Sequence, residues 1–180
     1  CDETLKRMNR RYTTEEYAEK AALIRDTLDI CTITTDVIVG FPGETDEEFA
    51  QSLDFVKRMQ FMQTHVFKYS RRKGTKADTM PDQVPENVKN TRSALMIEAA
   101  DLAKLAYEKS LIGTVRPVLI EEQEQDMHGR NINCGFSPEY TRIAVESSEN
   151  LAGRIADCRI TGFTETQNGR VLLADARHLY

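Results

Sequence analysis

The sequence predicts two parts, an α/β region over residues 1–111 and a small all-β antiparallel barrel of OB-like type over residues 112–180. In the first part, helical and strand-like segments alternate with short connections, which is typical of an α/β sheet or barrel. In the second part, short β-type segments are separated by turns, which is typical of a small barrel. The chain is 40% hydrophobic and 29% charged, and no apolar run approaches the ~18 residues that would span a bilayer. We therefore expect a soluble, cytoplasmic protein without a membrane partner.

Two capping boxes mark helix starts in the first part. Thr13 is followed three residues later by Glu16, and Thr45 is followed at the same spacing by Glu48. In such a box the hydroxyl and the carboxylate each accept a hydrogen bond from an otherwise unpaired backbone amide. Apolar residues then recur at helical spacing, which predicts one helix to about residue 28 and another to about residue 59.

The remaining elements of the first part are two strands, a loop and a long helix. The β-branched run 33–39 lacks clean alternation, so we expect a strand covered on both faces of a parallel sheet. Residues 65–69 predict the next strand, and the basic, turn-rich segment 70–85 predicts a long loop. Apolar positions at helical spacing over 86–111 predict a helix that closes the first domain.

Five short strands are expected in the second part. The charge of this second part does not favour a polyanion partner, because residues 112–180 contain seven arginines and ten acidic residues. The expected strands are 114–121, 131–135, 140–146, 153–160 and 170–174.

The ends of the two predicted parallel strands are the first place to look for a site, because loops at strand carboxyl ends converge. These ends are Gly40-Phe-Pro-Gly-Glu44 and Lys68-Tyr-Ser-Arg71. Glycine at 40 and 43 allows positive φ or a close backbone approach to a ligand. A tight strand-to-helix turn explains the first segment equally simply, since it matches neither the P-loop nor the G-x-G-x-x-G pattern.

Arginines form two groups with binding potential. The cluster Lys6, Arg7, Arg10 and Arg11 offers a guanidinium that would hold a carboxylate, although a solvated basic face is the simpler alternative. The barrel arginines alternate with apolar residues, so they are expected to share an outer face and meet phosphates; ordinary polar-out alternation is the alternative. These residues are Arg116, Arg142, Arg154 and Arg159.

No metal site or catalytic residue is indicated by the residues themselves. The four cysteines include no C-x-x-C pair, so we interpret them as structural or unused thiols. His65 has no partner at a metal or catalytic spacing and is interpreted as structural. A net charge of -5 also works against general RNA affinity, which depends on phosphate neutralisation.

Four motifs taken together are more specific than any one of them. The succession Leu5–Tyr12, Thr35–Thr45, His65–Thr75 and Met80–Val84 resembles the radical-SAM tRNA methylthiotransferases over the whole chain. The segment His65-Val-Phe-Lys-Tyr-Ser-Arg-Arg-Lys-Gly-Thr75 is most similar to the branch that acts on N6-threonylcarbamoyladenosine.

This resemblance implies the last third of a TIM-like radical-SAM barrel over residues 1–111 and a TRAM-type barrel over 112–180. It implies S-adenosylmethionine and two [4Fe-4S] clusters as cofactors of a longer parent protein. The family's C-x-x-x-C-x-x-C triplet is absent here, and Cys1 does not replace it, so this chain alone is expected to ligate no cluster and to be inactive. The sequence is therefore interpreted as a fragment.

The resemblance also assigns roles to individual residues. Arg10 would meet the carboxylate of S-adenosylmethionine, a task suited to a guanidinium. Ile38 and Gly40 would pack on the adenine. The backbone of the next strand, at Phe67, Lys68 and Tyr69, would lie along the edge of the cofactor. The tRNA anticodon arm would meet the barrel arginines and the loop residues Arg71, Arg72 and Lys73.

The chemistry implied is cleavage of S-adenosylmethionine to a 5′-deoxyadenosyl radical, which takes hydrogen from C2 of the modified adenosine at tRNA position 37. Sulfur and a methyl group then follow, with a sulfur donor and an electron donor as further partners. Three alternatives stay open: the isopentenyladenosine branch of the family, a non-catalytic RNA-binding module on an α/β scaffold, and an unrelated α/β enzyme that uses Gly40–Glu44 as an anion loop.

Overall fold

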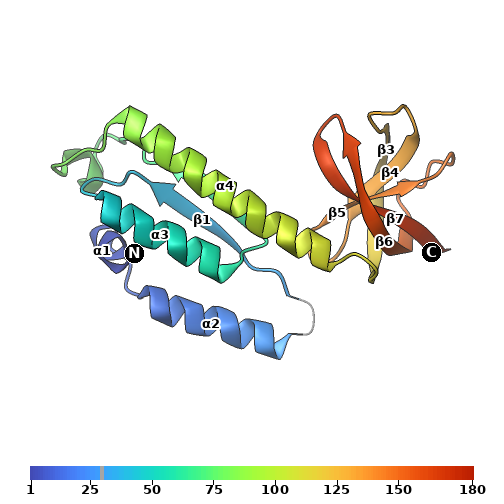
Figure 1. The fold of residues 1–180 in the computed structure, drawn as a ribbon, viewed down its shortest axis with the longest axis horizontal. Helices are drawn as coiled ribbons and strands as arrows, with labels where there is room; N and C mark the ends of the chain where they lie inside the picture. The colour runs from blue at the N-terminus through green and yellow to red at the C-terminus, as the bar shows by residue number, and fades with distance from the viewer. Residues whose placement is uncertain (29–30) are drawn as a thin grey trace. The chain divides into compact units, whose positions relative to one another are not determined.

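A computed structural model describes residues 1–28 and 31–180, which divide into two compact units, Cys1–Tyr107 and Glu108–Tyr180. The elements of the α/β unit (Figure 1) run in the order α1 (Asp2–Arg7), α2 (Thr14–Thr27), β1 (Thr34–Val39), α3 (Asp46–Met59), β2 (Gln63–Lys68), the 3-10 helix Lys76–Thr79 and α4 (Glu86–Ser110). The barrel unit contains β3 (Val115–Gln125), β4 (Asn131–Phe136), β5 (Arg142–Glu146), β6 (Ile155–Thr166) and β7 (Gly169–Leu179).

Both capping boxes are confirmed. The Thr13 hydroxyl accepts the Glu16 amide at 3.1 Å and the Glu16 carboxylate accepts the Thr13 amide at 2.8 Å, which begins α2. Thr45 and Glu48 make the same pair of bonds at the start of α3, at 3.2 and 3.1 Å. Each box satisfies two amides that a helix start otherwise leaves unpaired.

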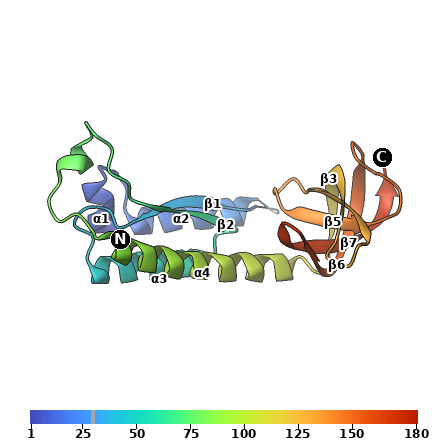
Figure 2. The ribbon, with the colours of Figure 1, turned by 90° about the horizontal axis from the view of Figure 1, so that it is seen from above.

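The strands β1 and β2 pair in parallel, with Thr34 opposite Gln63 and Val39 opposite Lys68. Figure 2 shows α3 and α4 on the same side of this sheet. Helix side chains such as Phe49, Val56 and Met96 form one apolar core with Val39. Because Val39 is the last residue of β1, this core holds the carboxyl end of that strand against the helices.

The expectation that β1 is covered on both faces is wrong. Its exposure alternates along the strand, with Thr34, Asp36 and Ile38 exposed and Val39 buried. The helices cover one face, where Val37 and Val66 join the core. The opposite face carries Ile38, which is paired with the half-exposed Phe67 of β2.

Helix α1 was not predicted, because six residues are too few to establish an apolar period. It buries Thr4 and is tied to the next helix by Asp2, whose carboxylate accepts the Thr14 amide at 2.8 Å. The basic residues of the first motif therefore begin on a helix and continue into the loop before α2.

The second unit is a closed five-stranded barrel in the order β3-β4-β5-β7-β6. It is not wholly antiparallel as expected, because β5 and β7 pair in parallel, with Ile143 opposite Leu172. The reason is that β6 and β7 form a long hairpin, and its second strand returns beside β5 in the same direction. The barrel interior includes the fully buried Val118, Ile120 and Ile160.

No helix within the described ranges is both long enough and apolar enough to cross a membrane.

Candidate functional site

A cavity of about 420 Å³ lies in the α/β unit, along β1 and beside the first two helices. Its lining combines residues of the first motif with both faces of β1, represented by Val37 and Ile38, and with core side chains of α3 such as Val56. Three of the residues singled out from the sequence contribute to it, namely Arg10, Ile38 and Phe67. Tyr12 and Asp36 add further polar groups to the wall.

Arg10 is the cation of this cavity. Its side chain makes no hydrogen bond or ion pair with the described residues, whereas its backbone amide is fixed by the Leu5 carbonyl at 2.8 Å. The guanidinium is therefore exposed at the cavity wall with its donors free for an anionic ligand.

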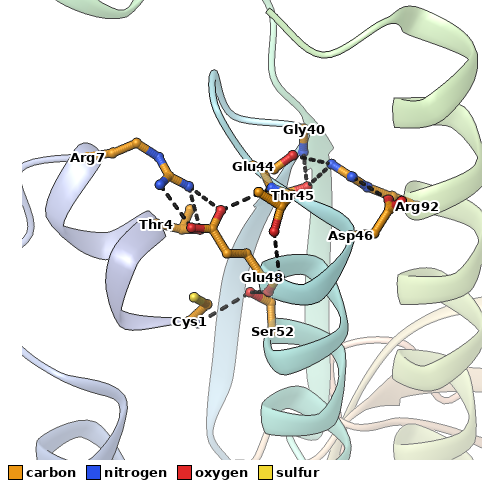
Figure 3. Close-up of polar contacts among 10 residues, drawn as sticks. All are labelled: Cys1, Thr4, Arg7, Gly40, Glu44, Thr45, Asp46, Glu48, Ser52 and Arg92. Carbon is orange, nitrogen blue, oxygen red and sulfur yellow. Dashed lines mark hydrogen bonds and ion pairs between the residues drawn. The ribbon is translucent and has the colours of Figure 1, made fainter. Parts of the chain in front are cut away.

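Arg7, from the same basic cluster, is already engaged. Its guanidinium holds the Glu48 carboxylate through two bonds, one of them 3.0 Å long, and also donates to the Thr4 hydroxyl at 3.3 Å (Figure 3). This bidentate pair holds the pKa of Glu48 below its ordinary value. One arginine of the cluster does hold a carboxylate, but that carboxylate is the chain's own.

Glu44 organises the turn after β1 (Figure 3). Its carboxylate accepts the Gly40 amide at 2.9 Å and the Arg92 guanidinium at 2.7 Å, and Arg92 also donates to Asp46 at 2.7 Å. The Glu44 and Arg92 side chains are only 2% and 6% exposed. Burial raises the pKa of Glu44, while the Gly40 amide and Arg92 oppose that shift.

This buried ion pair was not predicted, because Arg92 lies 48 positions along the chain from Glu44. A signal was present in Arg92 itself, which interrupts the apolar side of the α4 pattern between Val88 and Met96.

Gly40 does not line the cavity. Its φ of 72° lies in the left-handed region, and a Cβ at this position would run into the Lys89 side chain. Glycine is therefore required by the turn itself. The structure thus supports the tight-turn explanation of Gly40–Glu44, with the carboxylate of Glu44 facing inward.

Lys68 and Tyr69 also lie outside the cavity lining. The Lys68 ammonium donates to Glu86 and Asn90, both at 2.7 Å. The Tyr69 amide donates to the Val39 carbonyl at 2.9 Å, and its own carbonyl accepts from Lys89 at 3.0 Å. The backbone of Tyr69 is thus occupied by the fold.

In the loop after β2, Arg71 is fixed and its neighbours are exposed. Arg71 donates to the Asp78 carboxylate at 3.0 Å and to the Asp78 carbonyl at 2.7 Å. Arg72 and Lys73 are exposed, and their side chains have no polar partner among residues 1–28 and 31–180. This loop offers two available cations on a turn that Arg71 stabilises.

The barrel arginines do not share one face, contrary to expectation. Arg159 stands opposite Val115, while Arg116 stands opposite the buried Cys158 and so belongs to the other face of the same strand pair. The alternation in the sequence did not distinguish them, because the strand boundaries alone do not fix which face a residue occupies.

Two of these arginines are paired with carboxylates. Arg116 lies 3.4 Å from Glu139, and Arg142 donates to Glu122 at 3.0 Å and to Glu124 at 3.1 Å. The remaining two, Arg154 and Arg159, are exposed.

The two barrel thiols are unsuited to ligation. Cys134 and Cys158 are buried in the barrel, where burial raises their pKa to about 12 and about 11. Over residues 1–28 and 31–180, no group of three or more His, Cys, Asp or Glu side chains is placed to hold a metal ion. His65 is exposed on β2, beside Asp36 in the register.

The chain matches one family model and several known proteins. Residues 1–56 match the Radical SAM superfamily. The chain is 38% identical over 156 residues to the threonylcarbamoyladenosine tRNA methylthiotransferase MtaB of Bacillus subtilis (strain 168), covering 87% of this chain and 35% of the relative. It is 37% identical over 159 residues to the tRNA-2-methylthio-N(6)-dimethylallyladenosine synthase of Finegoldia magna, covering 88% and 34%. The synthase of the same name from Thermoanaerobacter sp. (strain X514) is 41% identical over 159 residues, covering 87% and 33%.

Residues 1–56 thus resemble a radical-SAM domain. More particularly, over most of its length the chain is similar to radical-SAM tRNA methylthiotransferases. It spans about a third of the length of the curated relatives it matches.

Proposed function

We propose that this chain is part of a tRNA methylthiotransferase that modifies C2 of N6-threonylcarbamoyladenosine at tRNA position 37. In this proposal residues 1–111 are the C-terminal part of a radical-SAM barrel and residues 112–180 are a TRAM-type, RNA-binding barrel. The observation that carries the proposal is the cavity of the α/β unit, which unites an unpaired Arg10 with the exposed apolar residues Ile38 and Phe67.

This cavity fits S-adenosylmethionine in its chemistry. Arg10 would hold the carboxylate, because a guanidinium presents paired donors to two oxygens. Ile38 and Phe67 would pack against the adenine, since an apolar wall with few polar groups suits a ligand of this size. S-adenosylmethionine, when bound, supplies the group that is transferred and the source of the radical. The part of this chain is to bind and orient it.

The residues present do not fit an iron–sulfur cluster. The four cysteines include no C-x-x-C pair, and Cys134 and Cys158 are buried in the barrel. Cys1 lines the cavity but is a single thiol there, whereas a cluster needs several. Cluster ligands would therefore come from elsewhere in the protein, and we derive no step through a cluster from this chain.

For tRNA we propose a contact through the Arg72–Lys73 loop and the barrel. Support comes from the two exposed cations of that loop and from the names of the relatives. A cytoplasmic location follows from a tRNA substrate. Sulfur and electron donors would act as further partners of the whole protein.

The relatives carry names from two branches, so the modified adenosine is the finer part of the proposal. The test uses the whole protein that carries these residues, anaerobically reconstituted with iron and sulfide and incubated with tRNA, S-adenosylmethionine and dithionite. Mass spectrometry of the nucleosides should show a methylthio group on threonylcarbamoyladenosine. The same group on isopentenyladenosine would refute the branch and keep the reaction. If clusters assemble and neither product forms, the proposed reaction is wrong.

A further inference from the structure

Two aromatic rings stack at the turn between β4 and β5. Phe136 ends β4 and Tyr140 lies in the turn, with ring centroids 4.7 Å apart and ring planes at 21°. Tyr140 is nevertheless 73% exposed. Since Phe136 backs one side of the Tyr140 ring, most of the remaining ring surface faces solvent.

The backbone holds Tyr140 in a conformation that a tyrosine rarely adopts. Its φ is 62°, which is the left-handed region and costs a bulky residue free energy. The turn is closed by bonds from the Tyr140 amide to the Ser137 carbonyl at 2.9 Å and from the Ser137 amide to the Thr141 carbonyl at 3.0 Å. Glycine would adopt this φ without strain. Stability of the turn therefore does not explain a tyrosine here.

The charges around this turn do not favour a contact dominated by phosphates. Arg142, which stands opposite Phe136 across β4 and β5, is paired with Glu122 and Glu124. Arg116 lies 3.4 Å from Glu139 of the turn. An arginine that already binds carboxylates gives less free energy on meeting a phosphate. Stacking on a base has no such requirement, because every nucleobase offers a π face.

We propose that Tyr140, supported by Phe136, is a platform on which an unpaired nucleobase of RNA stacks. The inference rests on the RNA contact proposed above for the barrel and names the residue that makes it. An aromatic ring with one face backed and the other open suits a planar π system. It also supplies affinity in a barrel where acidic residues outnumber arginines.

The test uses the 180-residue chain and two RNA probes. One probe is a hairpin with a fluorescent adenine analogue in its unpaired loop, and the other is a fully paired duplex with the analogue in the stem. Tyr140→Gly removes the ring and relieves the strained φ, while Tyr140→Phe keeps the ring. Tyr180→Ala is the matched control, because Tyr180 is also a barrel tyrosine with 73% exposure.

Wild type should bind the hairpin more tightly than the duplex and quench the analogue by stacking. Tyr140→Gly should weaken hairpin binding by about 5-fold to 150-fold, which corresponds to the loss of one stacked base, and should abolish the quenching. Tyr140→Phe and Tyr180→Ala should bind and quench as wild type does.

Hairpin binding and quenching that survive in Tyr140→Gly would overturn the platform and leave the RNA contact standing. If the wild-type chain binds neither probe, the RNA contact proposed for the barrel is wrong, and the platform is wrong with it. Circular dichroism checks that each variant is folded. If Tyr140→Gly is unfolded, Tyr140→Asn gives the same test, because asparagine tolerates positive φ.

Discussion

The two units of this chain use arginine differently. In the α/β unit, Arg92 and Arg7 are buried or partly buried against carboxylates of the turn and helix after β1, and Arg10 is left unpaired at the cavity. In the barrel, Arg116 and Arg142 are likewise paired with carboxylates, with side chains 20% and 24% exposed, and neither lines the cavity. The difference shows that an arginine in a motif indicates a ligand only when the fold has not already supplied its anion.

Among substitutions of these paired arginines, the largest loss of stability is expected at Arg92. Replacing it by methionine leaves the Glu44 carboxylate buried without its cation, which should lower the free energy of unfolding by about 3–5 kcal/mol. Adding Glu44→Gln removes the uncompensated charge and should recover part of the loss. Urea unfolding measures both variants. A cost below about 1 kcal/mol for Arg92→Met would contradict a structural role for the pair.

A smaller effect is expected at Arg7, where the side chains of Arg7 and Glu48 are 29% and 14% exposed. Water screens part of this interaction, so Arg7→Gln should cost about 1–2 kcal/mol, between the values for surface and buried pairs. The exposed neighbour Lys6, replaced in the same way, serves as the control and should leave the free energy of unfolding essentially unchanged. Equal losses for the two variants would show that the Arg7 pair contributes nothing specific.

The same pair predicts an acid sensitivity. Arg7 depresses the pKa of Glu48 below its ordinary 4.5, so this stabilisation is present above pH 4.5 and is lost as the pH falls below it. Glu44 has the opposite effect on the pH dependence of stability. Because its pKa is raised, the folded state binds a proton more readily than the unfolded state does, so its contribution becomes more favourable as the pH falls. Unfolding free energies measured from pH 6 to pH 3 should therefore fall less steeply in Arg7→Gln than in wild type. An unchanged slope would contradict the assignment.

The smallest effect on stability is expected at the barrel turn. Tyr140→Gly loses stacking on Phe136, about 0.5–1.5 kcal/mol, and gains relief of the left-handed φ, about 1–3 kcal/mol. Thermal unfolding should therefore show a barrel as stable as wild type or slightly more so. A destabilisation above about 2 kcal/mol would mean that the ring mainly supports the turn.

Local signals in the sequence predicted most of the α/β unit. The Thr13 and Thr45 capping boxes marked the starts of α2 and α3, because their hydrogen bonds involve residues only three apart. The Arg92–Glu44 pair joins residues 48 positions apart, and no local pattern reveals such a contact. Helix α1 was missed because it is shorter than two turns.

The barrel was predicted less completely. The existence of its strands followed from β-branched segments, but the parallel pairing of β5 with β7 depends on the order in which the barrel closes. For the same reason the sequence did not predict which face of the barrel each arginine occupies. That face is known only once the strand pairing and the β-bulges are known. At the candidate site, Arg10, Ile38 and Phe67 line one cavity, whereas Gly40, Lys68 and Tyr69 are used by the fold. Their role in binding S-adenosylmethionine stays a prediction.

The most direct test of the account compares two neighbouring arginines in the active whole protein. Arg10 lines the cavity and Arg11 does not, although both are exposed. Arg10→Gln should raise the KM for S-adenosylmethionine by roughly tenfold to 100-fold, the value of a hydrogen bond to a charged group, and Arg11→Gln should leave it unchanged. Equal KM values for wild type and both variants would contradict the claim that Arg10, the unpaired arginine of the cavity wall, binds the ligand.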